Sequence, residues 1–151
     1  MQLYFDQLRV TRQNAIKILS KFPSEKQVEI PKGFNNSLFW NFGHIVVVQQ
    51  LLSFGLSGLE VSIDQDILQY FKKGSNPKDR VLPISIEKLI ELSDELIAKT
   101  EQFYFNGKFK TYSPYTTSYG ISLNNIDEAI TFNNIHEGLH LGYMMAQSKS
   151  L

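Results

Sequence analysis

The chain contains no residue with a full charge between Lys32 and Glu60. This stretch is mostly apolar, but several asparagines and glutamines and one histidine interrupt it. A transmembrane helix would need about 20 predominantly apolar residues, so we do not expect a membrane span here. A helix that is apolar on most sides is instead expected to be buried among other helices. The stretch therefore predicts the buried helix of a helical bundle, and its histidine, His44, falls midway along that helix.

Apolar residues recur at helical spacing in four long segments. These segments predict helices over residues 3–22, 37–53, 85–105 and 126–147, with one short extra helix over 64–73. The expected fold is therefore all-α, a four-helix bundle that forms a single domain over residues 1–151.

The connections between these helices are long. Residues 26–36 and 54–63 contain Pro or Gly and are expected to form connectors. Residues 108–123 are rich in Thr, Ser and Tyr and are expected to form an extended loop near a pocket mouth. Such connections do not favour a simple up-down-up-down bundle with tight turns.

Charge and cysteine content exclude several classes of function. Lys plus Arg and Asp plus Glu both total 15, so the chain lacks the excess of positive charge that nucleic-acid or anionic-membrane binding requires. The chain contains no cysteine, which excludes disulfides, a thiolate zinc site and a cysteine nucleophile. The first residues have neither a basic segment nor an apolar run, so no signal peptide is expected and the cytoplasm is the expected location.

The three histidines of the chain suggest a metal site. His136 and His140 are four residues apart on a predicted helix, so their rings lie on one face and can reach one ion at about 2.0–2.1 Å. His44, on the buried helix, would complete a site for one divalent transition metal. Three protein ligands leave a position for water or substrate, which is typical of catalytic metals. The alternative for His44 is a core histidine whose polar atoms are satisfied by hydrogen bonds.

The last helix also matches the H-E-x-x-H pattern of zinc peptidases through His136, Glu137 and His140. That pattern usually has a third ligand downstream, and no Asp, Glu or His follows His140 here. Peptidase activity is therefore not expected. Glu137 is a candidate catalytic base, or alternatively a carboxylate on the helix surface.

Four further side chains share the helix faces of the histidines. Asn41, Asn133 and Tyr143 could hydrogen-bond an imidazole N–H or a bound water. Trp40 could form an apolar wall of the pocket, and its alternative role is core packing. Three glycines also lie inside predicted helices, where each costs roughly 1 kcal/mol relative to Ala, and we expect close backbone approach at these positions, Gly43, Gly138 and Gly142.

Two segments of the chain resemble DinB-like proteins. IPKGFNNSLFWNFGHI at residues 30–45 resembles the signature of their second helix. YGISL at residues 119–123, followed by HEGLHLG at 136–142, resembles their loop and last helix. The resemblance implies a four-helix bundle of DinB type, with unusual connectivity and a three-His metal site. Carried over to this chain, the ligands are His44, His136 and His140.

The resemblance also implies a homodimer and a zinc, nickel or other divalent ion. Some DinB-like proteins transfer or isomerise small molecules with a low-molecular-weight thiol. A thiol-dependent transferase acting on a small-molecule substrate is therefore the leading functional hypothesis. The alternatives are a non-catalytic metal-binding or sensor protein and a metal-dependent hydrolase.

Overall fold

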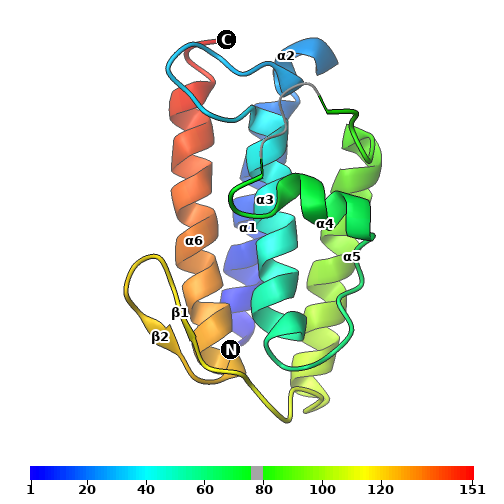
Figure 1. The fold of residues 1–151 in the computed structure, drawn as a ribbon, viewed down its shortest axis with the longest axis vertical. Coiled ribbons are helices and arrows are strands. Elements are labelled where there is room, and N and C mark those ends of the chain that lie inside the picture. The colour runs from blue at the N-terminus through cyan, green and yellow to red at the C-terminus, as the bar shows by residue number, and fades with distance from the viewer. Residues whose placement is uncertain (76–79) are drawn as a thin grey trace.

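The computed structural model describes residues 1–75 and 80–151. Four long helices lie side by side (Figure 1), namely α1 Gln2–Leu19, α3 Leu38–Gln50, α5 Ile86–Phe105 and α6 Ile126–Gln147. They correspond to the four predicted helices, and the prediction of an all-α fold is confirmed. Within the described residues, no helix combines the length and apolarity needed to cross a membrane.

Helix α3 is the most buried helix of the structure. All of its residues except Val48 are buried, and it packs against α1, α5 and α6. Its first turn is capped by Ser37, whose hydroxyl accepts from the Trp40 backbone N–H. After Gln50 the chain continues as a π-helix, η1 Leu51–Gly55, so the helical segment extends two residues past the predicted end at 53.

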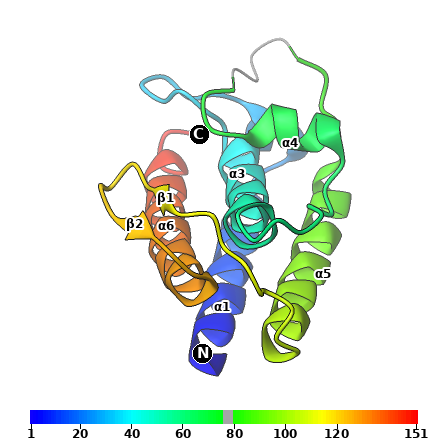
Figure 2. The ribbon, with the colours of Figure 1, turned by 60° about the horizontal axis from the view of Figure 1, so that its bottom comes forward.

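Three short elements surround the long helices. A short helix, α4 Gln65–Phe71, lies within the segment predicted for it, whereas α2 Ser24–Val28 overlaps the start of the segment predicted as a connector. The predicted loop at 108–123 contains an antiparallel hairpin of β1 Tyr115–Thr116 and β2 Ser122–Leu123, which lies beside α6 (Figure 2). Strands of two residues are too short to produce an alternating pattern, so the hairpin left no signal in the sequence.

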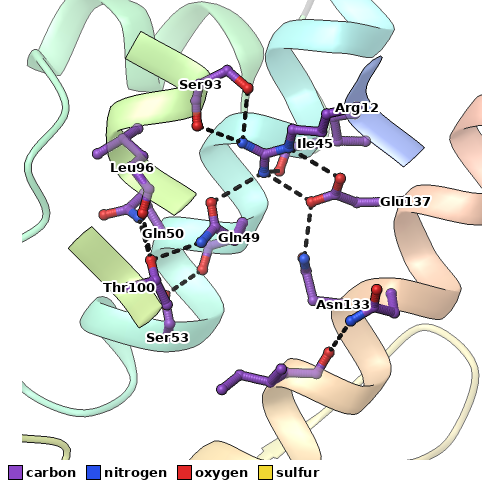
Figure 3. A network of polar contacts seen from close by, with 12 residues as sticks. Arg12, Ile45, Gln49, Gln50, Ser53, Ser93, Leu96, Thr100, Asn133 and Glu137 are labelled. Atoms are coloured by element: carbon purple, nitrogen blue, oxygen red, sulfur yellow. Dashed lines mark hydrogen bonds and ion pairs between the residues drawn. The ribbon is translucent and has the colours of Figure 1, made fainter. Parts of the chain in front are cut away.

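One arginine connects all four long helices (Figure 3). Arg12 of α1 is fully buried and donates to Glu137 of α6 and to the backbone and side chain of Ser93 of α5. It also donates to α3 through Ile45 O at 3.3 Å and Gln49 Oε1 at 3.0 Å. A buried charge is tolerated only when it is paired and hydrogen-bonded, and this guanidinium is both.

Helices α3 and α4 approach closely at Gly43. A Cβ atom placed on Gly43 would lie 2.3 Å from the Phe71 ring, so only glycine fits without displacing that ring. This contact explains why glycine occupies position 43, one of the three glycines within predicted helices. At Gly138 and Gly142 a Cβ would meet no atom of the described chain within 4 Å, so the expected close approach is not found there.

We expect Gly43→Ala to lower the free energy of unfolding by about 1–3 kcal/mol, because the added methyl overpacks the core against Phe71. Gly138→Ala is the matched control. It should raise stability by up to about 1 kcal/mol, since alanine is the better helix former and its methyl has open space. Urea unfolding followed by circular dichroism measures both. Equal effects of the two substitutions would contradict the proposed contact.

Candidate metal centre

The three histidines lie together between α3 and α6. His44 comes from α3, and His136 and His140 come from successive turns of α6. One ring nitrogen from each lies within 4.8 Å of the others, and the ring centroids are 4.7–5.3 Å apart. The structure therefore brings the three predicted ligands into one group, positioned to bind a metal ion.

The backbone at the end of α4 holds the His44 ring. Its Nδ1 lies 2.7 Å from the carbonyl oxygen of Phe71. Because a carbonyl can only accept, Nδ1 carries the proton and the Nε2 lone pair is left available. The Trp40 indole stacks on the imidazole at 4.7 Å and 13°, and its own N–H donates to Tyr70 O and Ser75 Oγ. These contacts fix both the orientation and the tautomer of His44.

His140 is oriented by Asn41. The His140 Nδ1 lies 3.0 Å from Asn41 Oδ1. The Asn41 amide nitrogen donates to Ser37 O at 2.9 Å and to Gln147 Oε1 at 3.2 Å, which identifies its other terminal atom as the acceptor oxygen. His140 is therefore protonated on Nδ1 and also keeps its Nε2 lone pair.

His136 lacks such an anchor. Its Nδ1 is buried and has no hydrogen-bond partner among the described residues. The Phe132 ring is inclined by 27° to the imidazole, with the centroids 6.3 Å apart. A buried, unpartnered ring nitrogen is costly, so an ion bound at His136 Nδ1 would remove an energetic defect of the metal-free site.

The three imidazoles are neutral at neutral pH. Burial, and then the charges of His140 and His44, lower the pKa of His136 to about 3. Burial, and then the charge of His44, lowers the pKa of His140 to about 4. Burial also lowers the pKa of His44, although its hydrogen bond to Phe71 O acts in the opposite direction. Neutral imidazole is the form that binds metals.

This donor set fits a divalent transition metal. Three neutral imidazoles suit zinc, nickel and copper better than magnesium or calcium, which prefer oxygen ligands. The separation of up to 4.8 Å between ligand atoms is wider than two ligands about 2.0–2.1 Å from one ion can span, so the rings would have to draw together on binding. His136 has no protein hydrogen bond at Nδ1 to restrain that movement within the described chain.

A cavity of about 310 Å³ opens beside His44 and His136. Its walls are apolar and come mainly from α3, η1 and α6, with Val48, Leu51, Leu52, Leu56 and Phe132. Four of its lining residues are solvent-exposed and mark its mouth, namely Gly55, Lys73 and, from the predicted 108–123 loop, Tyr115 and Ser118, whereas Thr117 of the same loop is buried. A reacting molecule in this cavity would thus lie against two of the three histidines and against an apolar wall.

The structure places Glu137 away from this cavity. Glu137 is fully buried, and its carboxylate accepts from Arg12 Nη2 at 2.8 Å and Nε at 3.1 Å. It also accepts from Asn133 Nδ2 at 2.9 Å, and it does not line the cavity formed by the described residues. Its contacts therefore support a role in the buried polar network of Figure 3, and they do not support the role of catalytic base or that of a surface carboxylate.

Asn133 and Tyr143 are not brought to the imidazoles. Asn133 donates to Glu137 instead. Tyr143 is 38% exposed and packs edge-on against Phe34 at 5.3 Å. Both share the α6 face of the histidines by helical spacing, but α6 is contacted by α1 and α3 on different sides, and these neighbours decide which side chains turn inward.

Sequence reasoning missed two residues that shape the site. Phe71 acts through its backbone carbonyl, which no side-chain pattern reveals. Arg12 did leave a signal, because it lies four residues after Leu8 and three before Ala15 on the apolar face of α1. A charged residue at a core position predicts a buried ion pair.

Acid should destabilise the metal-free protein. Unfolded histidines titrate near pH 6.5, whereas His136 and His140 in the folded state titrate at about 3 and 4. The unfolded state therefore binds more protons as the pH falls below 6.5, and the free energy of unfolding decreases down to about pH 3, the lower of the two folded-state pKa values. Urea unfolding across this range measures the slope. The variant His136→Gln should reduce the slope of unfolding free energy against pH, whereas Tyr143→Phe should leave it unchanged. An unchanged slope in His136→Gln would refute the lowered pKa of His136.

Comparison with known proteins agrees with this geometry. Residues 7–144 match the family model of the DinB superfamily. A comparison with curated proteins finds no match. The family match covers most of the chain, from within α1 to within α6, and includes all three histidines. The chain belongs to the DinB superfamily.

Proposed function

We propose that this protein binds one divalent transition metal, zinc or nickel, and uses it in a thiol-dependent transfer reaction on a small-molecule substrate. The observation that carries the proposal is the group of three neutral imidazoles beside an apolar cavity. His44, His136 and His140 would hold the ion. A divalent ion stabilises a bound thiolate or hydroxide directly, and so lowers the pKa of the corresponding thiol or water.

The residues around the centre have separate tasks in this proposal. Phe71 O and Asn41 Oδ1 hold two ring N–H groups, which keeps the opposite nitrogens of His44 and His140 available. Trp40 and Phe132 cover the rings and exclude water. The chain has no cysteine, so the thiol would have to come from a second small molecule.

We further propose that the protein acts in the cytoplasm and forms a homodimer, as the family resemblance implies. The balanced charge of the chain supports self-association, because two copies would not repel each other. Helix α6 also exposes large apolar side chains, Ile135, Leu139 and Met145, which a second copy would cover.

Metal binding is tested by ligand substitution. The native protein is purified without a histidine tag and freed of metal with a chelator. It should then rebind about one zinc or nickel ion per chain. His44→Ala and His140→Ala should each abolish tight binding, and Asn41→Ala should weaken it by about 10–100-fold because the His140 ring loses its anchor. Tyr143→Phe is the control. Competition with a chromogenic chelator measures affinity, and a native protein that rebinds neither metal would refute the site.

Thiol chemistry is tested with an activated halogenated arene and a panel of small thiols. The metal-loaded protein should accelerate attack of the thiolate on the ring carbon, with release of halide. The acceleration should require the metal and be lost in His140→Ala.

Cobalt substitution provides a second readout for the same reaction, because a thiol that binds the ion changes its visible spectrum. If no thiol is accelerated and none changes the spectrum, the non-catalytic metal-binding alternative replaces the transferase. Ester hydrolysis without any thiol would favour the hydrolase.

A further inference from the structure

The cavity beside the histidines has two chemically different regions. Most of its lining is aliphatic or aromatic, contributed by η1 and by Phe132. The only charged side chain among the described lining residues is Lys73, which follows α4 and is exposed at the mouth. We propose that the cavity takes an amphipathic anion, with its apolar body against the η1 wall and its single anionic head at Lys73. This inference names a substrate class for the proposed function and rests on that function for the location of the reacting atom.

The apolar wall sets the size and nature of the body. Leu51, Leu52 and Leu56 follow one another along η1 and its C-terminal end, and Val48 precedes them on α3. Three leucines of six consecutive residues therefore line one cavity. A volume of about 310 Å³ corresponds to about ten non-hydrogen atoms at about 30 Å³ each. A medium-length alkyl or aryl group fits this space.

Lys73 determines the charge of the head group. Its ammonium forms no ion pair within 4 Å with any carboxylate of the described residues, and no described acidic residue lines the cavity. Its positive charge is felt at the centre, where it contributes to lowering the pKa of His44. A cationic ligand would meet only like charge here, whereas a carboxylate or phosphate would receive a charge-assisted hydrogen bond.

The hairpin favours the same head group. Ser118, in the turn between β1 and β2, is exposed beside the mouth and offers a hydroxyl donor. The Thr117 hydroxyl accepts from the Tyr119 and Ile121 backbone N–H groups, which shapes the turn that presents Ser118. A lysine and a hydroxyl at the mouth, above an apolar interior, form the polar end of an amphipathic site.

The test uses the metal-free protein and four probes with the same chain, octanoate, octyl phosphate, 1-octanol and octylamine. Trp40 is the only tryptophan and stacks on His44, so its fluorescence reports binding, with calorimetry as a second readout. The two anions should bind about tenfold more tightly than 1-octanol, since a charge-assisted hydrogen bond contributes on this scale. Octylamine should bind most weakly. Whichever anion binds more tightly identifies the head group as carboxylate or phosphate.

Two lysine variants separate the role of Lys73 from general charge. Lys73→Gln should reduce the affinity for both anions about tenfold, to that for 1-octanol, and leave 1-octanol binding unchanged. Lys72→Gln removes the neighbouring charge, which does not line the cavity, and should bind all four probes like the native protein. Both lysines are at least partly solvent-exposed and lie outside α4, so both variants should fold.

Equal affinity for octanoate and 1-octanol, no effect of Lys73→Gln, or no binding of any probe would each overturn the inference. Anion binding that appears only after metal loading and is the same in Lys73→Gln would also overturn it, because the ion would then hold the head. These results are distinct from failure of the proposed function. Lys73-dependent anion binding by a protein that takes up no metal would reject the metal centre alone.

Discussion

The ion pair between Arg12 and Glu137 is the interaction on which the arrangement of the long helices depends. Removing two charges from water costs several kcal/mol per ion, and the cost is offset only if nearly every donor and acceptor is paired. All three guanidinium nitrogens donate, to groups on α3, α5 and α6. The pair therefore tolerates few rotations of these helices. Glu137 is adjacent to His136, and Ile45, whose carbonyl accepts from Arg12, is adjacent to His44. The network thus holds the histidine-bearing turns of α3 and α6 in register.

Helix α6 carries two sets of polar residues whose contacts differ in charge. Glu137 and Asn133 face the buried network, where the Glu137 carboxylate pairs with the Arg12 guanidinium. His136 and His140 meet His44, where burial keeps the rings neutral. A position one residue along a helix is rotated by about 100°, so adjacent residues serve the two environments without competing. This division explains why the glutamate of the H-E-x-x-H string lies outside the cavity.

Much of the fold could be predicted because its signals are local. The last helix was expected over residues 126–147 from its apolar spacing, and the structure places α6 there, with the Asn125 side chain accepting from the Glu128 backbone N–H. The buried α3 was expected from its lack of charge. The π-helix η1 and the hairpin could not be predicted, because segments this short produce no periodic pattern. The carbonyl of Phe71 could not be predicted as a partner of His44, because that contact joins two separate helices. Ser113 N–H likewise donates to Leu56 O across more than fifty residues.

The sequence alone determined which residues could form the metal centre, since three histidines at these positions on two apolar helices have few other roles. It also predicted that α3 would be buried in a core, because its charge-free segment is interrupted by asparagines, glutamines and a histidine and does not suit a membrane span. The tertiary structure decided which nitrogens are free, what Glu137 does and where the cavity opens. Helical spacing defines a face, but it does not say which neighbouring helix covers that face. A buried polar group acquires its role only from the partner packed against it.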